Sequence, residues 1–257
     1  MINIALVSYL NTRPFMDGFE AHMQDRSFEF QLVPPADCAK LLARGQSQMA
    51  LIPVGAMENF HGLHLMPNFC IGSNGPVESV FIFSEVPITE ARHLILDSHS
   101  RSSNGLAQIL LRHHWKHQPG LELPTFRDFS RIQGQTAGVV IGDKAIHLKG
   151  SFPYEYDLSQ AWKELTGLPF AFAVWAYQPG VFSKKQLAEL DEAMRLGVAR
   201  RAQTAQRWAE HYGTDPAYAA HYLQHCIDFH FDGAKHKAVN LYLQLLQQLP
   251  KPELQLV

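Results

Sequence analysis

The chain has 257 residues, of which 46% are hydrophobic and 18% are charged, and its formal net charge is -2. This composition is typical of a folded globular protein and leaves no basic surplus for nucleic-acid binding. The opening residues, MINIALVSYL, have no basic segment and no small-residue cleavage site, and their apolar run is too short to span a membrane. We therefore expect a cytoplasmic protein that binds neither nucleic acid nor membranes.

The N-terminal part of the chain alternates between apolar strands and helices. The pattern predicts strands over Ile2–Tyr9, Phe28–Pro34 and Gln48–Pro53, with helices from Pro14 to about Met23 and over Pro35–Ala43. A β-α-β-α-β order is typical of a parallel sheet with right-handed crossovers. The fold class is therefore α/β.

The remainder of the chain continues the α/β pattern and then becomes helical. Further strands are predicted over Val77–Ser84, Leu94–Asp97, Thr136–Ile141 and Phe170–Tyr177, with helices over Gly105–His114 and Tyr156–Thr166. Residues 184–249 have a purely helical pattern, broken at 213–216 and 232–233.

This layout predicts two lobes. We expect residues 1–82 and 175–257 to form the first lobe and residues 86–170 the second. The two long strands Val77–Ser84 and Phe170–Tyr177 are the expected crossings between the lobes, and together they form a hinge beside a ligand cleft.

A polar junction follows the first strand, with the sequence Ser8-Tyr9-Leu10-Asn11-Thr12-Arg13-Pro14. Asn11 and Thr12 are residues that cap helices, and Pro14 suits a first turn. In open α/β sheets, ligands bind beyond the carboxyl ends of strands, where free N–H groups of the next helix face them. This junction is thus predicted to contact a small anion.

Two more junctions follow the same logic, one in the second lobe and one in the loop that enters the first crossing strand. The run Ser98–Ser103 places several hydroxyl groups and Arg101 beside a helix start, which suits a carboxylate, and Gly75–Ser79 leads into the first crossing strand. Any one such junction is more often only a helix cap. Three in one two-lobed pattern favour a ligand site.

Metal and nucleophile motifs are weak. His113, His114 and His117 cluster at a predicted helix end, and His221 and His225 have Tyr222 where a zinc-protease motif needs Glu. The three cysteines are widely spaced, without a C-x-x-C pair. We expect no metal site, no disulfide framework and no cysteine nucleophile.

The junctions coincide with motifs that resemble one enzyme family. The matching runs are SYLNTRP (Ser8–Pro14), MALIPV (Met49–Val54), SNGPVESVFIFS (Ser73–Ser84), DSHSRSSNGL (Asp97–Leu106), VIGDKA (Val140–Ala145) and YDLSQAWKELTGLPFAFAVW (Tyr156–Trp175). Together they resemble chorismate dehydratase of the futalosine pathway to menaquinone. Ser103 and Ser159 depart from the family pattern, where Thr and Gly are expected.

The resemblance implies a two-lobed fold like that of type II periplasmic binding proteins. It implies a carbon-oxygen lyase (hydro-lyase) that converts chorismate, a small-molecule substrate, to 3-[(1-carboxyvinyl)oxy]benzoate, without a metal or organic cofactor. No oligomeric state follows from it.

On this reading, Asn11 and Ser79 are the expected catalytic residues, which orient the reacting groups. The expected substrate-binding residues are Ser8, Tyr9, Thr12, Ser100, Arg101, Ser102, Ser103 and Asp143. The hypothesis for proton removal is that the substrate's own enolpyruvyl carboxylate takes the proton. Asp143 is an alternative base and His99 a weaker one.

Two other functions stay open from the sequence. One is a non-catalytic small-anion binding protein, because a fold does not fix a function. The other is the sibling enzyme 1,4-dihydroxy-6-naphthoate synthase, which opens with a His-Ser-Pro-type motif, whereas no histidine precedes His22 here. A ligand-sensing regulator has no helix-turn-helix or basic patch to support it.

Overall fold

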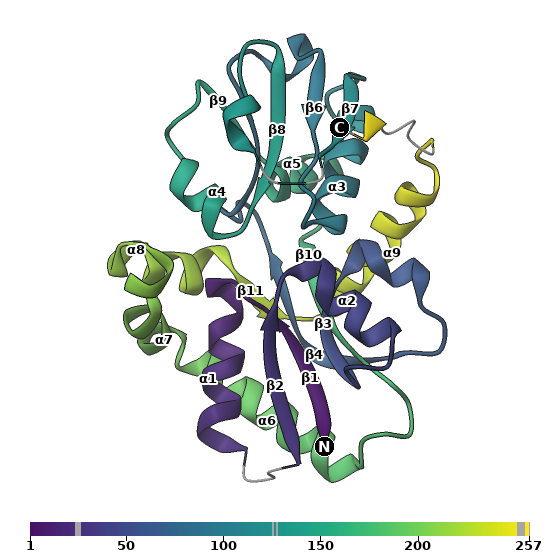
Figure 1. Cartoon of the computed structure of the whole chain (residues 1–257), viewed down its shortest axis with the longest axis vertical. Helices are drawn as coiled ribbons and strands as arrows, with labels where there is room; N and C mark the ends of the chain where they lie inside the picture. The colour runs from purple at the N-terminus through teal and green to yellow at the C-terminus, as the bar shows by residue number, and fades with distance from the viewer. Residues whose placement is uncertain (24–26, 125, 127, 251–254, 257) are drawn as a thin grey trace. The chain divides into compact units, whose positions relative to one another are not determined.

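The computed structural model describes residues 1–23, 27–124, 126, 128–250 and 255–256. The chain divides into two compact units, and each is described by itself (Figure 1). Unit 1 comprises Met1–Gly72 and Ala171–Gly233, and unit 2 comprises Ser73–Phe170 and Ala234–Val257. The backbone therefore passes from one unit to the other three times, at 72/73, 170/171 and 233/234.

Unit 1 is built on a six-stranded mixed sheet with the order β11-β4-β10-β3-β1-β2. Its strands are β1 (Ile2–Val7), β2 (Phe28–Val33), β3 (Met49–Pro53), β4 (His64–Ser73), β10 (Phe170–Tyr177) and β11 (Asp228–His230). Strand β1 runs parallel to both of its neighbours, β2 and β3, while β10 is antiparallel to β3, and β11 to β4. Residues 4–7 and all of β3 are buried, as their continuous apolar sequence predicts.

Helices cover both faces of this sheet. They are α1 (Arg13–His22), α2 (Pro35–Ala43), α6 (Lys184–Ala199), α7 (Arg201–Trp208) and α8 (Pro216–His221), with shorter turns η1 (Leu10–Thr12), η2 (Val54–Asn59), η5 (Glu210–Tyr212) and the π-helical η6 (Tyr222–Cys226). The chain steps from β1 to β2 and then back past β1 to β3, so right-handed crossovers put α1 and α2 on opposite faces (Figure 1).

Packing against the sheet and against α6 fixes the position of helix α1, which follows the β1 junction. Phe15 is fully buried, and its ring meets Trp175 of β10, Phe69 of β4 and Phe229 of β11 in edge-to-face contacts at 5.5, 6.1 and 5.5 Å. Gly18 lets α1 approach α6 closely, because a Cβ there would overlap the carbonyl oxygen of Ala193. Aromatic packing and a close helix crossing thus hold α1 rigidly under the β1 junction.

Unit 2 has its own six-stranded sheet, ordered β12-β7-β6-β8-β5-β9. The strands are β5 (Val80–Ser84), β6 (His93–Ile95), β7 (Gly120–Leu123), β8 (Thr136–Ile141), β9 (Tyr154–Asp157) and β12 (Gln255–Leu256). Strands β12, β7, β6 and β8 are mutually parallel, and β5 is antiparallel to both β8 and β9.

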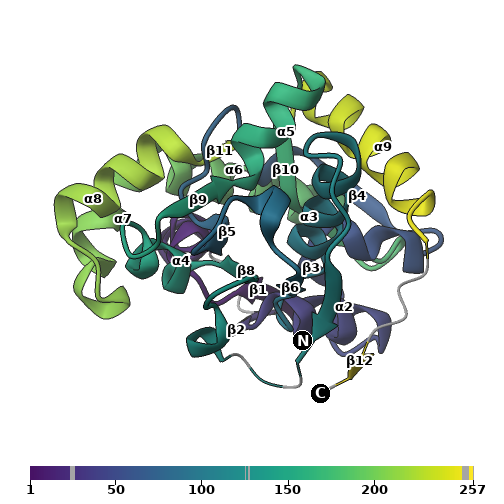
Figure 2. The same ribbon diagram turned by 90° about the horizontal axis from the view of Figure 1, so that it is seen from above.

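The helices of unit 2 are α3 (Arg101–His113), α4 (Asp143–Leu148), α5 (Leu158–Thr166) and α9 (Gly233–Gln247), with short turns η3 (Ile88–Glu90) and η4 (Phe129–Arg131). Helix α9, drawn in yellow in Figure 2, is joined to this unit by the fully buried Tyr242. The ring of Tyr242 meets Trp162 of α5 at 6.4 Å and Phe170 at 5.3 Å. Its hydroxyl donates to the Ser102 carbonyl of α3 at 3.0 Å. No described helix is both long and apolar enough to cross a membrane.

The predicted division into lobes needs correction. Val77–Ser84 is not a crossing strand, because β5 pairs along its length with β8 and β9 of unit 2; the first crossing comes earlier, at the end of β4. Phe170–Tyr177 does lie at a crossing. The C-terminal helix α9 belongs to unit 2 rather than to the first lobe, so the backbone passes between the units three times rather than the two times predicted.

Two local predictions were also wrong. Tyr156 and Asp157 were assigned to a helix but end strand β9, and the helix α5 begins at Leu158. The C-terminal region is not purely helical, because Asp228–His230 forms the edge strand β11. The buried thiol of Cys70 lies 3.8 Å from the Asp228 carbonyl oxygen and 3.4 Å from that of His230, which ties β4 to this edge strand.

Candidate functional site

The polar junction of unit 1 lies at the carboxyl end of β1. Because β3 runs parallel to β1, the end of β3 at Pro53 lies at the same edge of the sheet. The Ser8 N–H donates to the Val33 carbonyl at 3.0 Å, and the chain then turns through η1 into α1. Ser8 and Tyr9 are half-buried, while Asn11 and Thr12 are buried.

Part of the expected cradle of free helix N–H groups is used within this junction. The Thr12 N–H donates to the Tyr9 carbonyl at 3.1 Å, the Arg13 N–H donates to the Leu10 carbonyl, and Pro14 has no N–H. Neither Tyr9 nor Thr12 forms a side-chain cap at these helix starts. The 3-10 turn therefore uses the backbone N–H donors of Thr12 and Arg13, so the side chains gain importance as anion-binding groups.

Asn11 is the most firmly oriented side chain of the junction. Its Nδ2 donates to the hydroxyl of Tyr222 at 3.1 Å, and its Oδ1 accepts from the Thr12 hydroxyl at 3.3 Å. An amide offers two N–H donors and one carbonyl acceptor, so these contacts fix its orientation and leave one N–H and one lone pair for another partner. Asn11 is thus a preorganised donor rather than a helix cap.

Sequence reasoning missed Tyr222. It lies in the π-helical turn η6, is 1% exposed and comes from a region that carried no recognised motif. A π-helical turn shifts side chains relative to an α-helix and is frequent at functional sites. Hydrophobic periodicity does not predict such a turn, so the sequence offered no direct signal.

Three segments of unit 2 meet at one edge of the second sheet. Strand β6 is parallel to β8, so the residues after Ile95 and after Ile141 lie at the same edge. Strand β5 is antiparallel to β8 and pairs Val80 with Ile141, so Ser79 begins at that edge as well. Two of the predicted junctions, together with Asp143, are therefore brought together by the strand register.

The loop before Ser79 is held by a buried carboxylate. Asp157 accepts from the N–H groups of Val77 (2.9 Å), Glu78 (2.8 Å), Ser159 (3.0 Å) and Gln160 (3.1 Å), which join the loop to the start of α5. Burial raises the pKa of Asp157, and the four N–H donors oppose that effect. Sequence reasoning placed Asp157 inside a helix and missed this role.

Glu78 shows that the loop is constrained. It has a positive φ of 57°, a conformation that is unusual for a non-glycine residue, and its carboxylate pairs with Lys149 at 2.9 Å. The next residue, Ser79, is 2% exposed, and its carbonyl accepts from the Gly142 N–H at 2.8 Å. Asp143 follows directly in the first turn of α4 and is half-buried.

The Ser98–Ser103 junction is also constrained. Ser100 caps α3, its hydroxyl oxygen accepting from the Ser103 N–H at 3.1 Å, so its O–H remains a donor. Ser100, Ser102 and Ser103 are buried, whereas Arg101 is exposed.

Asn104, which no motif argument singled out, braces the same turn. Its amide exchanges hydrogen bonds with the Asp97 backbone at 2.9 and 2.8 Å, while Asp97 Oδ1 accepts from the His99 N–H at 2.9 Å. These bonds set the path by which the chain leaves β6 and enters α3.

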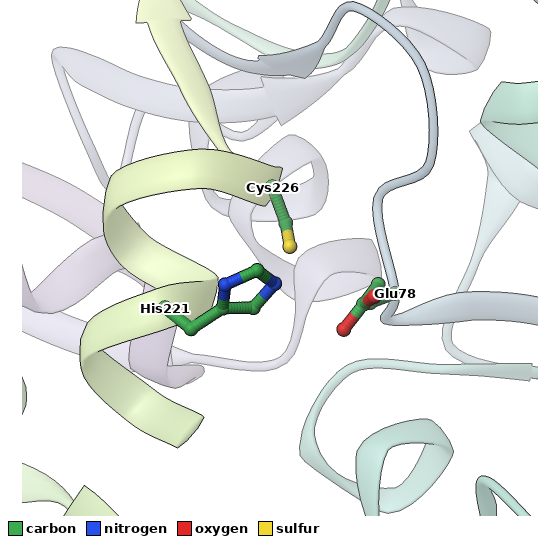
Figure 3. A group of neighbouring side chains, drawn as sticks. All are labelled: Glu78, His221 and Cys226. Carbon is green, nitrogen blue, oxygen red and sulfur yellow. The ribbon is translucent and has the colours of Figure 1, made fainter. Parts of the chain in front are cut away.

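The described part of unit 1 contains a pair of potential metal ligands. His221 and Cys226 lie close together at the two ends of the π-helical turn, while Glu78, drawn with them in Figure 3, belongs to unit 2. One imidazole and one thiol fall short of the three or four protein ligands of a zinc site. All three cysteines are buried and outside disulfides, and burial raises the pKa of Cys38 to about 12, so the Cys38 thiol is a poor nucleophile.

Taken separately, each edge supplies neutral donors from hydroxyl, amide and backbone groups. Such donors can stabilise negative charge that develops on a bound carboxylate or enolate. Strong acid-base groups are sparse, with Asp143 and His99 the candidates at the unit 2 edge.

Comparison with known proteins agrees with this chemistry. A family described as menaquinone biosynthesis matches residues 2–248. The chain is similar to a chorismate dehydratase from Thermus thermophilus, with 28% identity over 214 residues, which is 74% of this chain and 76% of the relative.

Solved structures show the fold class. Protein AF1704 from Archaeoglobus fulgidus superposes with a TM-score of 0.75 at 14% identity, covering 96% of this chain and 97% of that one. A Candida albicans protein described as having the generic periplasmic binding protein fold gives a TM-score of 0.63 at 14% identity, covering 98% and 92%. The predicted periplasmic-binding-protein-like α/β fold is confirmed.

Proposed function

The chain belongs to the menaquinone biosynthesis family, and from this premise we propose that it is a chorismate dehydratase of the futalosine pathway. The observation that supports the proposal most directly is the orientation of Asn11 by Tyr222 and Thr12, within the motif that first indicated the family. The activity printed for the Thermus thermophilus relative points the same way.

The reaction is the elimination of water from chorismate. Removal of the C3 proton leaves a carbanion conjugated through the ring to the C1 carboxylate, and loss of hydroxide from C4 then makes the ring aromatic. The products are 3-[(1-carboxyvinyl)oxy]benzoate and water. Since the second step gains aromaticity, the enzyme has to assist mainly the first.

In this proposal the protein acts as an orienting and charge-stabilising frame. The remaining N–H of Asn11 and the hydroxyl of Ser79 orient the reacting groups, while Ser100, Arg101, Ser102 and Ser103 hold a carboxylate. Ser8, Tyr9 and Thr12 complete the unit 1 edge. The substrate's enolpyruvyl carboxylate takes the proton, which makes the reaction substrate-assisted.

The experiment is a turnover assay with chorismate, followed by mass spectrometry of the aromatic product. We expect Asn11→Ala to lose most activity and Asp143→Asn to retain it. A matched control is Asp128→Asn, because Asp128 is a half-buried carboxylate that caps the turn η4 in the same unit. An Asp143→Asn variant that binds chorismate without converting it would identify Asp143 as the base and refute the substrate-assisted route.

A binding protein without catalysis is the second candidate, favoured by the similarity to periplasmic binding proteins. It predicts that chorismate binds and is recovered unchanged. The sibling naphthoate synthase is tested in the same assay by offering its cyclic futalosine substrate in place of chorismate.

A further inference from the structure

Arg13, the first residue of α1, lies in an aromatic setting within unit 1. It is 8% exposed, and its Nε donates to the Tyr212 hydroxyl at 2.7 Å. The guanidinium carbon lies 3.8 Å from the centre of the Trp208 ring and 5.4 Å from that of Tyr212. These contacts fix the plane of the guanidinium group.

A second arginine on the same tryptophan shows what is unusual about Arg13. Arg207 lies 5.0 Å from the Trp208 ring, but it is 59% exposed and pairs with Asp17 at 3.3 Å and Glu20 at 3.8 Å. Arg13 is much more deeply buried, yet among the described residues no carboxylate lies within ion-pair distance of it.

The nearby Asp17 is already engaged and does not fill this role. It accepts from the Thr204 hydroxyl at 2.7 Å and from the Trp208 indole N–H at 2.9 Å, besides its pairing with Arg207. Arg207 therefore has carboxylate partners. Arg13, in contrast, is a buried cation without a counter-ion in the described part of the chain.

Burying a charge without a partner is costly, so a buried arginine in this setting favours the binding of an anion. The Nε of Arg13 is occupied by Tyr212, and its two Nη atoms donate no hydrogen bond within the described residues. A planar pair of Nη–H groups held in place by stacking matches the two oxygens of a carboxylate.

We propose that Arg13 is a carboxylate-binding residue of unit 1, and that its Nη groups hold one carboxylate of an aromatic or cyclic dicarboxylate. It adds a charged donor at a junction where the Thr12 and Arg13 backbone N–H groups are used within the η1 turn. The identification of that dicarboxylate with chorismate rests on the function proposed above, whereas carboxylate binding by Arg13 does not.

The test is isothermal titration calorimetry of the full-length protein with chorismate, benzene-1,3-dicarboxylate and benzoate. We expect the Arg13→Gln substitution to weaken binding of the two dicarboxylates about 10- to 100-fold. The variant protein should then bind benzoate and benzene-1,3-dicarboxylate with nearly equal affinity. The matched control Arg207→Gln removes the other guanidinium from Trp208 and is expected to leave all three affinities within about twofold.

Folding is checked by the thermal unfolding midpoint, and Arg13→Lys provides a variant that keeps the charge. Lysine lacks the planar pair of donors, so we expect it to recover only part of the lost affinity. Wild-type affinity for benzene-1,3-dicarboxylate in Arg13→Gln, or no dicarboxylate binding by the wild type, would overturn the proposal.

The outcomes separate this inference from the proposed function. Should the wild type bind benzene-1,3-dicarboxylate through Arg13 but leave chorismate unchanged, the dehydratase proposal fails and the carboxylate site stands. Should the wild type convert chorismate while Arg13→Gln keeps its KM and affinities, the carboxylate site fails and the dehydratase stands.

Discussion

Replacing Tyr222 with Phe removes a single oxygen from the support of Asn11. The two side chains are 1% and 9% exposed, and their hydrogen bond is 3.1 Å long. Without the hydroxyl, the Asn11 amide loses the acceptor that fixes its orientation. A buried hydrogen bond of this kind contributes about 1 kcal/mol, and an unpaired buried donor costs about 1–3 kcal/mol.

We expect kcat for chorismate to fall about 5- to 10-fold, because about 1 kcal/mol of orientation is lost in the transition state. KM should change little, since Tyr222 contacts Asn11 rather than the substrate in this mechanism. Steady-state kinetics measure both values, and urea unfolding measures the accompanying loss of stability.

Tyr156→Phe is the matched control. Its hydroxyl accepts from the Ile88 N–H at 2.9 Å, so the substitution also removes one hydrogen bond, but at the centre of the β5–β9 pair in unit 2. We expect a similar loss of stability with kcat unchanged. The reasoning is refuted if Tyr222→Phe keeps the wild-type kcat while Asn11→Ala is inactive.

Three further predictions concern stability and reactivity. Asp157→Ala leaves four backbone donors without their acceptor, so the free energy of unfolding should fall by at least about 2 kcal/mol in urea titrations. Gly18→Ala should destabilise by about 1–3 kcal/mol because its Cβ overlaps the Ala193 carbonyl, whereas Gly233→Ala, which meets no atom within 4 Å, should not. Burial raises the pKa of Cys38 to about 12, so its thiol should react with a disulfide reagent at pH 8 only as fast as local or global unfolding exposes it. Rapid labelling of the native protein would contradict this prediction.

The order of strands and helices near the N-terminus follows from sequence because local patterns determine it. The continuous apolar runs at Ile2–Val7 and Met49–Pro53 form the buried strands expected of them. Helix α2 occupies Pro35–Ala43, as the pattern of its residues predicts. In these elements, burial and local conformational preference agree.

The hydrogen bonds that hold the candidate site residues could not be predicted from local sequence patterns, because they join residues far apart in the chain. Asn11 and Tyr222 are 211 residues apart, and Asp157 reaches back to Val77 across 80 residues. Asn11 could be named from its motif, but its partner lies in a π-helical turn without a sequence signature. Asp157 was identified neither as a helix cap nor as a loop anchor, because Tyr156 and Asp157 fit the helical period of the residues that follow.

Ser159 illustrates a departure from the family pattern that the structure accommodates. Its hydroxyl lies 2.5 Å from that of Ser73, and both residues are buried. The two hydroxyls satisfy each other, so a polar side chain is tolerated where glycine was expected.

The backbone passes between the two units three times, and this has a consequence for folding during translation. Strand β4 lies between β10 and β11 in its sheet, yet a ribosome must synthesise the main segment of unit 2 before β10 emerges, and α6 to α8 before β11. Until then, an apolar strand that includes Phe69, Cys70 and Ile71 has neither of its neighbours. Unpaired strand edges in partly made chains favour aggregation. Nascent chains of this protein are thus expected to depend on chaperones until translation has passed β11, at residue 230.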